Sequence, residues 1–438
     1  MPNTATAARR LQVAPSGRTL QYADGTPFFY LGDTAWQLFH RLNREEADLY
    51  LANRAVKGFT VIQAVALAEL GGLEVPNPYG HLPLVDQDPL RPHEPYFRHV
   101  DYIVERAAAL GLVVGLLPTW GRHWKLVGHE GRAIFTPANA RPYGRFLGQR
   151  YRGQPIIWIL GGDANVESAE ERAIIDAMAE GLDEGDGGEH LMTFHPRGPG
   201  LSSDALHDAG WLDFNMIQSS HGARDHDNGL FVERDYARQP VKPTVDGEPR
   251  YEGIPVGFYF AHVNRLDRMT DDDIRQAAYW SVLAGACGFT YGNNNIWQMW
   301  APGREPAIAA NIPWNEALDH PGAFQMGHLR RLFERCAFDQ LAPAPQALAD
   351  GPTQGGAKVR VALARDGSRL VAYTPRGEPF TLDKSAIRAP RAQESWFDPR
   401  YGALYPFHTT DNQGYQTYLP PTQGRGQDWV LVLEGKER

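Results

Sequence analysis

The stretch Ile156-Ile157-Trp158-Ile159-Leu160-Gly161-Gly162-Asp163-Ala164-Asn165 is an apolar run that stops at two glycines and then presents an acid. The run has the length and the β-branching of a strand that is covered on both faces. Asp163 is therefore expected at the carboxyl end of a strand, where α/β proteins place their chemistry. The alternative is that Asp163 or Asn165 caps the helix that follows.

A second acid lies in a similar setting, in the stretch Pro243-Thr244-Val245-Asp246-Gly247-Glu248-Pro249. Here a short apolar strand ends in an acid, a glycine and another acid. Glycoside hydrolysis requires two carboxylates that face one crevice: one protonates the leaving oxygen, and the other attacks or activates water. If Asp163 only caps a helix, Asp246 is the alternative proton donor.

Apolar strands alternate with helical patterns on both sides of these acids. A capping box at residues 43–46 begins one helix, Gly58 ends it, and a strand follows at once. Counted in this way, eight strands begin near residues 28, 59, 112, 156, 190, 214, 241 and 288. We predict an α/β fold of the (β/α)8 TIM barrel class, preceded by a β-hairpin over residues 11–27. A doubly wound sheet is the alternative, but the first strand is not followed by a G-x-G-x-x-G phosphate loop.

The pattern changes near residue 341. Prolines and glycines cluster between residues 343 and 356, and short alternating runs separated by turn residues follow. We therefore divide the chain into a catalytic barrel over residues 1–340, hairpin included, and a small antiparallel β-sandwich over residues 341–438. We expect the second domain to pack on the barrel without supplying residues to the acid pair.

The composition argues against several classes of binding partner and cofactor. The net charge of −9 and the lack of a basic stripe argue against nucleic acid. Cys287 and Cys336 are the only cysteines, which excludes a disulfide framework and a cysteine zinc site. The run Arg224-Asp225-His226-Asp227-Asn228 carries oxygen atoms of the kind that bind Ca²⁺. Their spacing fits no known calcium-binding loop, so we interpret the run as an ordinary solvated loop. We expect no metal and no organic cofactor.

The sequence shows neither a secretory signal nor a membrane-spanning segment, which favours a soluble, cytoplasmic protein without a membrane partner. A chain from which a signal had been trimmed would look the same and would be secreted or periplasmic. The sequence does not indicate an oligomeric state.

Several motifs together resemble a known family. They are Gly17-Arg18 with Asp24-Gly25, the stretch from Pro27 to Trp36, the strand ending in Gly161-Gly162-Asp163-Ala164-Asn165, and the stretch from Asp246 to Tyr251. This combination is similar to the apiosidase-like glycoside hydrolases, a family with endoglucanase-type barrels. The tail from Ser395 to Gly402 resembles the family's collagen-binding-like C-terminal β domain.

The resemblance implies a retaining, double-displacement mechanism with Glu248 as nucleophile and Asp163 as acid and base. The larger group of retaining barrel enzymes instead has Asn-Glu at the fourth strand end. We expect Asp163 to have a raised pKa and Glu248 to stay ionised through donors such as Tyr251. The resemblance suggests a β-linked apiose or another furanose in a plant- or microbe-derived saccharide. An endo-β-glucanase-like activity and a non-catalytic carbohydrate-binding protein are the alternatives.

Polar and aromatic residues near the other strand ends are candidates for substrate binding. Carboxylates and amides bind sugar hydroxyls, flat aromatic faces stack on sugar rings, and histidines at strand ends contact substrates. Asp33 could instead cap the segment of Trp36 or pair with an arginine, and either glutamine could satisfy buried backbone groups. A lone histidine is more often structural, but two at successive strand ends beside an acid pair favour substrate contact. The complete set is Asp33, Trp36, Gln63, Trp120, His123, Asn165, His195, Gln218, His221, Tyr251, Asn293 and Trp297.

Overall fold

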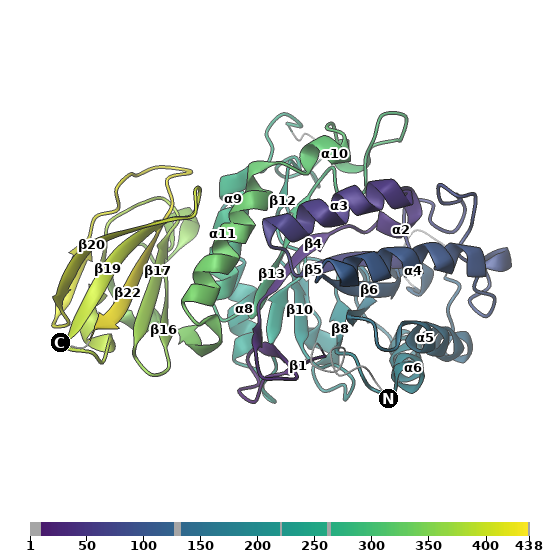
Figure 1. Cartoon of the computed structure of the whole chain (residues 1–438), viewed down its shortest axis with the longest axis horizontal. Helices are drawn as coiled ribbons and strands as arrows, with labels where there is room; N and C mark the ends of the chain where they lie inside the picture. The colour runs from purple at the N-terminus through teal and green to yellow at the C-terminus, as the bar shows by residue number, and fades with distance from the viewer. Residues whose placement is uncertain (1–9, 127–132, 220, 261–263, 437–438) are drawn as a thin grey trace.

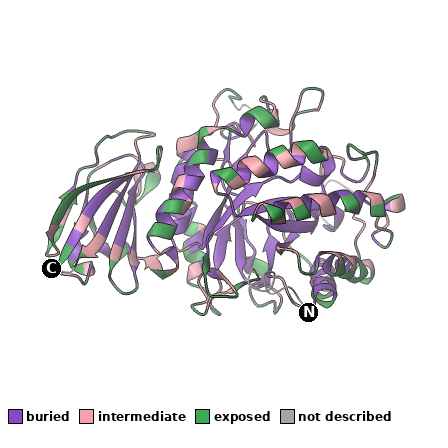
Figure 2. Ribbon diagram, in the orientation of Figure 1, coloured by how far each residue is buried: buried purple, intermediate pink, exposed green. Residues whose placement is uncertain are grey.

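The computed structural model describes residues 10–126, 133–219, 221–260 and 264–436. In Figure 1, helices surround a sheet of parallel strands in the larger N-terminal part, and an all-β domain lies beside this part at the C-terminal end. Figure 2 shows strands that are buried along most of their length and helices that expose one face. This layering is what a parallel sheet covered by amphipathic helices requires.

The first described residues form a three-stranded antiparallel sheet of β1 (Leu11–Val13), β2 (Leu20–Tyr22) and β3 (Pro27–Phe28). The predicted Asp-Gly turn joins β2 to β3. Gly25 has φ +86° there, and its N–H donates to the carbonyl of Tyr22 at 2.9 Å. The predicted hairpin is confirmed, and it belongs to a slightly larger sheet.

Eight parallel strands form a nearly closed barrel sheet, and each lies close to its predicted position. They are β4 (Tyr30–Thr34), β5 (Val61–Leu67), β6 (Val113–Thr119), β7 (Ile156–Gly161), β8 (Met192–His195), β10 (Asn215–Gln218), β11 (Thr244–Asp246) and β13 (Gly288–Asn293). Their order around the sheet is β8-β7-β6-β5-β4-β13-β11-β10. Because the pairs are parallel, the carboxyl ends of all eight strands meet at one side of the barrel.

The barrel is least regular between β8 and β10. These strands form no ladder; the N–H of Asp213 donates to the carbonyl of Met192 at 2.9 Å, and the hydroxyl of Thr193 donates to the carbonyl of Phe214 at 2.6 Å. The connection holds the antiparallel strand β9 (Gly200–Leu201) and only the four-residue helix α7 (Ser203–Leu206). This departs from the strict (β/α)8 pattern that we predicted.

Longer helices cover the other connections. They are α3 (Arg44–Lys57), α4 (Glu94–Ala109), α5 (Pro137–Tyr151), α6 (Ala169–Asp186), α8 (Gly229–Tyr236), α9 (Asp271–Leu283) and α11 (Pro321–Arg335), with α2 (Leu38–Arg41) and α10 (Trp314–Ala317) as short additions. The predicted capping box of α3 is present: Asn43 Oδ1 accepts from the N–H of Glu46, and Glu46 Oε2 accepts from the N–H of Asn43. None of the helices in the described ranges is long and apolar enough to cross a membrane.

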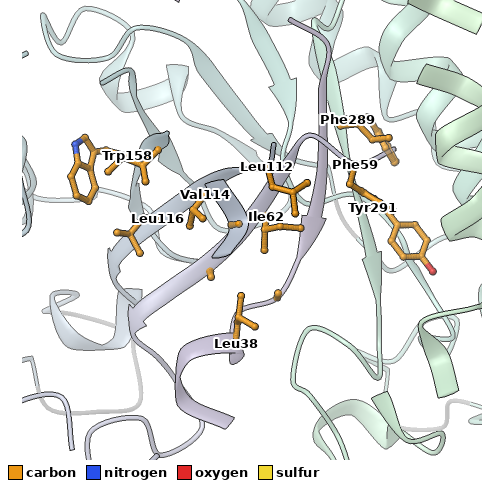
Figure 3. Packing of buried hydrophobic residues seen from close by; sticks show 14 of the residues in the cluster. Leu38, Phe59, Ile62, Leu112, Val114, Leu116, Trp158, Phe289 and Tyr291 are labelled. Atoms are coloured by element: carbon orange, nitrogen blue, oxygen red, sulfur yellow. The ribbon is translucent and has the colours of Figure 1, made fainter. Parts of the chain in front are cut away.

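Alternation along β7 explains its unbroken apolar run. Ile157 and Ile159 point into a cluster inside the barrel, whereas Trp158 and Leu160 join the cluster between the strands and the helices. Figure 3 shows Trp158 beside Leu116 of β6 in this outer layer. A strand with two buried faces cannot show an apolar-polar alternation.

The C-terminal domain consists of two antiparallel sheets. The larger sheet has the order β14 (Leu341–Pro343), β16 (Arg360–Ala364), β17 (Arg369–Thr374), β22 (Trp429–Lys436), β19 (Arg391–Asp398), β20 (Ala403–Asp411), and the smaller has β15 (Leu348–Asp350), β18 (Phe380–Asp383), β21 (Tyr415–Tyr418). An apolar cluster fills the space between the sheets. On its other face the larger sheet packs on α9, where the rings of Tyr279 and Tyr373 stack at 4.7 Å. The domain therefore has its own core and also a face against the barrel.

Candidate active site

The chain turns sharply at the end of β7. Gly161, Gly162 and Asp163 have φ values of +94°, +93° and +52°, a region that favours glycine. A Cβ on Gly162 would lie 2.9 Å from the ring of Trp120, and one on Gly161 would lie 2.5 Å from the carbonyl of His195. The two glycines thus allow the backbone to pass close to its neighbours and to present Asp163.

Asp163 does not cap a helix. The N-cap of α6 is Ser168, whose hydroxyl accepts from the N–H of Glu171 at 3.1 Å. The N–H of Asp163 donates to Nδ1 of His195 at 3.2 Å, while its half-buried carboxylate has no hydrogen-bond or ion-pair partner among the described residues. The capping alternative is therefore wrong, and no described residue pairs with the carboxylate.

Glu248 has the opposite setting. It follows β11 and is 6% exposed. Its Oε1 accepts from the hydroxyl of Tyr251 at 2.8 Å and lies 3.0 Å from Nε2 of His221; its Oε2 lies 2.8 Å from Nε2 of His195. Three side chains from different strand ends thus converge on one carboxylate.

The partners of the two histidines define where their protons lie. Nδ1 of His195 accepts from Asp163, so its proton is on Nε2, which faces Glu248. His221 faces acceptors on both sides, the carbonyl of Pro249 at 2.6 Å from Nδ1 and Glu248 at 3.0 Å from Nε2. Two acceptors require two protons, so His221 is an imidazolium next to the carboxylate.

These settings separate the pKa values of the two acids. Burial and the negative charge of Glu248 raise the pKa of Asp163 to about 6. Burial also acts to raise the pKa of Glu248, but the contacts with His195 and His221 outweigh it and hold that pKa well below its ordinary value. The pKa values of Asp163 and Glu248 are thus shifted in the directions that we expected, one upward and the other downward.

Asp246, the alternative proton donor, is buried away from this pair. Its Oδ2 accepts from Ser219, Asn228 and Ser281, each at 2.9 Å. The side chain is 0% exposed, so it ties β11 to the surrounding elements rather than reaching the acid pair.

Glu69 is an acid that sequence reasoning missed. It follows β5, is half-buried, and its carboxylate has no hydrogen-bond or ion-pair partner among the described residues. Burial and the negative charges of Asp163 and Glu248 raise its pKa to about 8. The structure therefore brings a third carboxylate into the electrostatic field of the pair.

Three of the predicted substrate contacts, Trp36, Trp120 and Trp297, belong to one apolar cluster beside His195, which we call the aromatic wall. Trp36 is buried, with its ring 5.2 Å from that of Trp120 and 5.3 Å from that of His195. Trp297 is 6% exposed and belongs to the same apolar cluster as Trp36 and Trp120. The wall lies next to His195, which contacts Glu248.

Other predicted contacts are polar groups near strand ends. Oδ1 of Asn165 accepts from the N–H of Arg197 at 3.0 Å and so shapes the loop after β8. Gln218 ends β10, and its Oε1 is buried without a partner among the described residues. Tyr251 has the predicted position at Glu248. His195 and His221 bind this carboxylate and are buried, which makes them partners of Glu248 rather than the substrate contacts we expected.

The prediction that Asp33 contacts the substrate is wrong. Its Oδ2 accepts from Nε of Arg54 at 2.7 Å and from the hydroxyl of Tyr50 at 2.5 Å, and both partners belong to α3. All three side chains are 0% exposed. The carboxylate points outward into the helix layer, as the arginine-pairing alternative proposed, and does not form the floor of a crevice.

Three further predicted substrate contacts are also corrected, because the polar groups of these residues contact other groups of the protein. Gln63 accepts from Tyr30 at 2.8 Å and donates to the carbonyl of Gly247 at 3.0 Å, which supports the backbone before Glu248. Nε2 of His123 lies 3.1 Å from the carbonyl of Ala68. Asn293 is 0% exposed, and its amide lies 2.9 Å from Nδ1 of His320.

Comparison with known proteins defines the class. A solved structure titled "Glycoside hydrolase" is 33% identical, with a TM-score of 0.89 over 100% of this chain and 98% of that chain. A glycoside hydrolase family 5 structure from Bacteroides vulgatus is 31% identical, with a TM-score of 0.88 over 97% and 93% of the two chains. A family 5 mannosidase from Rhizomucor miehei, 14% identical with a TM-score of 0.52 over 75% and 98%, shares the fold alone. The protein is a glycoside hydrolase of the family 5 type.

Matches to two protein-family models identify the family of this chain. The model described as "Apiosidase-like, catalytic domain" matches residues 14–340, and the one described as "Putative collagen-binding domain of a collagenase" matches residues 342–434. The chain belongs to the apiosidase-like family, as its motifs suggested. A search of curated proteins found no match.

Proposed function

We propose that this protein is a retaining glycosidase in which Glu248 is the nucleophile and Asp163 the general acid and base. The observation that carries the proposal is the unequal supply of donors at the two acids. Glu248 is contacted by Tyr251, His221 and His195, whereas the carboxylate of Asp163 has no partner among the described residues. One acid is thus kept ionised and the other protonated, which is what double displacement needs.

In the first step, Oε2 or Oε1 of Glu248 attacks the anomeric carbon while the bond to the leaving oxygen breaks. Asp163 gives its proton to that oxygen, so that an alcohol departs and a glycosyl ester of Glu248 remains. The donors on Glu248 keep it ionised in the free enzyme and hold its rotamer, since an undirected carboxylate would be misaligned for attack.

In the second step, Asp163 acts as the base. Esterification removes the negative charge of Glu248, which is one of the causes of the raised pKa of Asp163. The pKa of Asp163 therefore falls, and its carboxylate takes a proton from water as the water oxygen attacks the anomeric carbon. The ester breaks, the sugar is released with its configuration retained, and Glu248 is again ionised.

For the substrate, we propose a plant- or microbe-derived saccharide that carries a β-linked apiose or another furanose. Membership of the apiosidase-like family supports this choice. An endo-β-glucanase-like activity is the alternative, supported by the family 5 character of the similar structures. A carbohydrate-binding protein without catalysis is not favoured, because the site has two acids whose pKa values are shifted in opposite directions.

We also propose how the chain is divided. Residues 1–340 form the catalytic part, a (β/α)8 barrel in which α7 and β9 replace one regular helix, and residues 341–438 form the β-sandwich. Retention further predicts carboxyl groups of Asp163 and Glu248 about 5 to 5.5 Å apart in a crystal structure, whereas about 6.5 to 9.5 Å would indicate inversion.

Hydrolysis of a panel of aryl glycosides tests the function. The panel contains β-apiosides, other furanosides and β-glucosides. We expect wild-type protein to release the phenol from an apioside or another furanoside, and Glu248→Gln to be slower by at least about a thousandfold because an amide cannot form the ester. No turnover of any member, or equal rates for both proteins, would contradict the proposal.

A further inference from the structure

One loop contacts both the candidate nucleophile and the C-terminal domain. We call residues 221–228, between β10 and α8, the anchor loop. We propose that the C-terminal domain fixes this loop and thereby positions His221 on Glu248, so that the domain is a structural part of the active site. The inference rests on the proposed role of Glu248, and it assigns a task to a domain that supplies no side chain to the acid pair.

The inner end of the anchor loop is His221. Its Nε2 lies 3.0 Å from Oε1 of Glu248, and its Nδ1 lies 2.6 Å from the carbonyl of Pro249. Its ring centroid is 4.3 Å from that of Tyr251, the other donor to Oε1. A shift of this end of the loop would therefore remove the imidazolium from Glu248.

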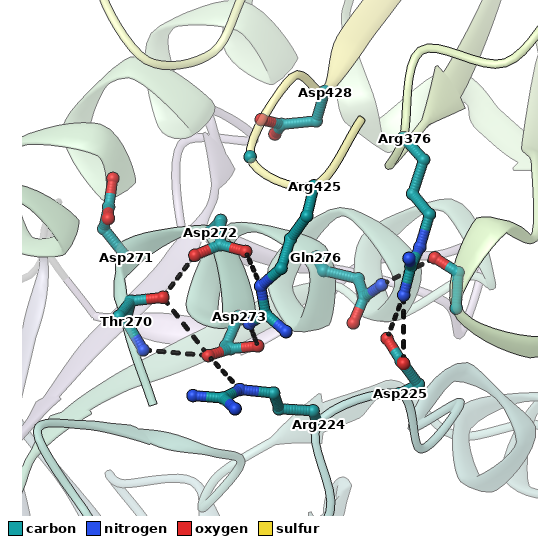
Figure 4. Close-up of polar contacts among 12 residues, drawn as sticks. Arg224, Asp225, Thr270, Asp271, Asp272, Asp273, Gln276, Arg376, Arg425 and Asp428 are labelled. Carbon is teal, nitrogen blue, oxygen red and sulfur yellow. Dashed lines mark hydrogen bonds and ion pairs between the residues drawn. The ribbon is translucent and has the colours of Figure 1, made fainter. Parts of the chain in front are cut away.

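The outer end of the loop is held by cations of the C-terminal domain. Asp227 accepts from Nζ of Lys358 at 2.7 Å and from Nη2 of Arg360 at 2.8 Å and 2.9 Å. These three side chains are 11%, 17% and 6% exposed, so the charges depend on one another. Asp225 pairs with Arg376 at 3.0 Å, as Figure 4 shows, but both side chains are more exposed and this pair contributes less.

A second connection reaches the middle of the loop through Arg250, two residues after Glu248. This buried guanidinium donates to the carbonyls of Ala223, at 3.2 Å, and His226. It also donates to Oε1 of Gln276 at 2.9 Å, and Nε2 of Gln276 donates to the carbonyl of Gly356 in the C-terminal domain at 2.9 Å. The segment of residues 356–360 thus contacts the loop both directly and through Gln276.

The run from Arg224 to Asn228 that we interpreted as a solvated loop is therefore an interdomain contact. Positioning matters here because a displacement of about 1 Å in a catalytic group can reduce a rate about a hundredfold. No described side chain beyond residue 340 contacts Asp163 or Glu248, so an effect of the domain on them is indirect, and His221 of the anchor loop is the contact through which we expect it to act.

The test uses three variants of the full chain. The double substitution Lys358→Gln/Arg360→Gln removes both cations from Asp227, and Lys358→Arg/Arg360→Lys keeps both charges. The control is Asp428→Asn, which breaks the pair with Arg275 at 2.8 Å. That pair crosses the same interface and is 1% and 2% exposed, but it does not contact the anchor loop.

We expect the neutral double variant to lose about tenfold or more in kcat with little change in KM, because the substrate still binds while Glu248 lacks the imidazolium of His221. The charge-preserving variant should recover most of the rate. Asp428→Asn should keep wild-type kcat below its unfolding temperature. Wild-type kcat in the neutral variant, or an equal loss in Asp428→Asn, would overturn the proposal.

A readout without turnover separates this inference from the proposed function. In the ¹⁵N NMR spectrum, His221 of the wild type should show the shifts of an imidazolium, and the neutral double variant should show those of a neutral ring at the same pH. If no glycoside is hydrolysed, the proposed function fails while this spectrum still decides the positioning. Unchanged His221 shifts in the neutral variant would contradict the inference.

Discussion

The ends of β7 and β11 present two carboxylates in opposite environments. Within the described part of the chain, the carboxylate of Asp163 has no partner and its pKa is raised to about 6, whereas Glu248 is held by Tyr251, His221 and His195 and has a pKa far below its ordinary value. His195 connects the two residues, because its Nδ1 accepts from the backbone N–H of Asp163 and its Nε2 lies 2.8 Å from Oε2 of Glu248. Burial acts to raise the pKa of both carboxyl groups. The number of hydrogen-bond donors around each carboxylate, rather than burial, therefore distinguishes the acid from the nucleophile.

Asp33 is a carboxylate that is fully buried and paired with a fully buried arginine. Replacing it in Asp33→Asn leaves the fully buried guanidinium of Arg54 without its counter-charge. We expect the free energy of unfolding to fall by about 3 to 5 kcal/mol while kcat at low temperature stays close to wild type. Urea denaturation and kinetics at a temperature below unfolding measure the two effects. A loss of activity with stability intact would restore Asp33 as a substrate contact.

His221→Gln removes the positive charge beside Glu248 but keeps a donor. We expect kcat/KM to fall about a hundredfold and its acidic limb to move to higher pH, because Glu248 then needs a higher pH to ionise. The pH-rate profile checks both effects. His226→Gln, in the same loop, is the matched control, and an equal loss there would mean that the loop rather than the charge is responsible.

Tyr251→Phe removes one donor from Oε1 of Glu248. A hydrogen bond to a charged group contributes about 1.5 to 3 kcal/mol, so we expect a loss of about tenfold or more, concentrated at low pH. Tyr279→Phe is the control, because the buried hydroxyl of Tyr279 has no partner among the described residues. Wild-type activity in Tyr251→Phe would mean that the histidines alone hold the nucleophile.

Glu69→Gln should have the smallest effect. The acid must be protonated in the first step, so activity should decline as the pH rises through about 6, the pKa of Asp163. Glu69, with its pKa raised to about 8, is already neutral in that range, and Gln preserves its shape. We expect the basic limb of kcat/KM to stay near pH 6. A wild-type limb near pH 8 that disappears in Glu69→Gln would make Glu69 the proton donor.

Much of the barrel could be predicted because the apolar runs, glycine stops and capping boxes repeat regularly. The connection between β8 and β10 could not, since the short α7 has no periodic pattern to detect. Asp33 and Asp163 show the limit for side chains. Both follow a glycine near the end of a buried strand, yet Asp33 lies within β4 and faces the helices, whereas Asp163 lies beyond β7 in a left-handed turn.

Glu69 was missed for a related reason. The second strand was expected to end at Gln63, but β5 continues to Leu67 through small and apolar residues. Gln63 therefore lies inside the barrel, and the true strand end precedes Glu69. A strand extended through the run Ala64-Val65-Ala66-Leu67 would have pointed to this acid. Tyr251 lies three residues from Glu248 and was predicted as its donor, but His195 and His221 come from other strand ends, and no local pattern reveals their contacts with Glu248.

The most direct test of the two roles is azide rescue on an activated aryl glycoside. Asp163→Ala should still form the glycosyl ester but deprotonate water poorly, and azide, which needs no base, should restore turnover and give a glycosyl azide of retained configuration. Asp246→Ala should show no such rescue. Rescue of Asp246→Ala but not of Asp163→Ala would contradict the assignment of Asp163 as the acid and base.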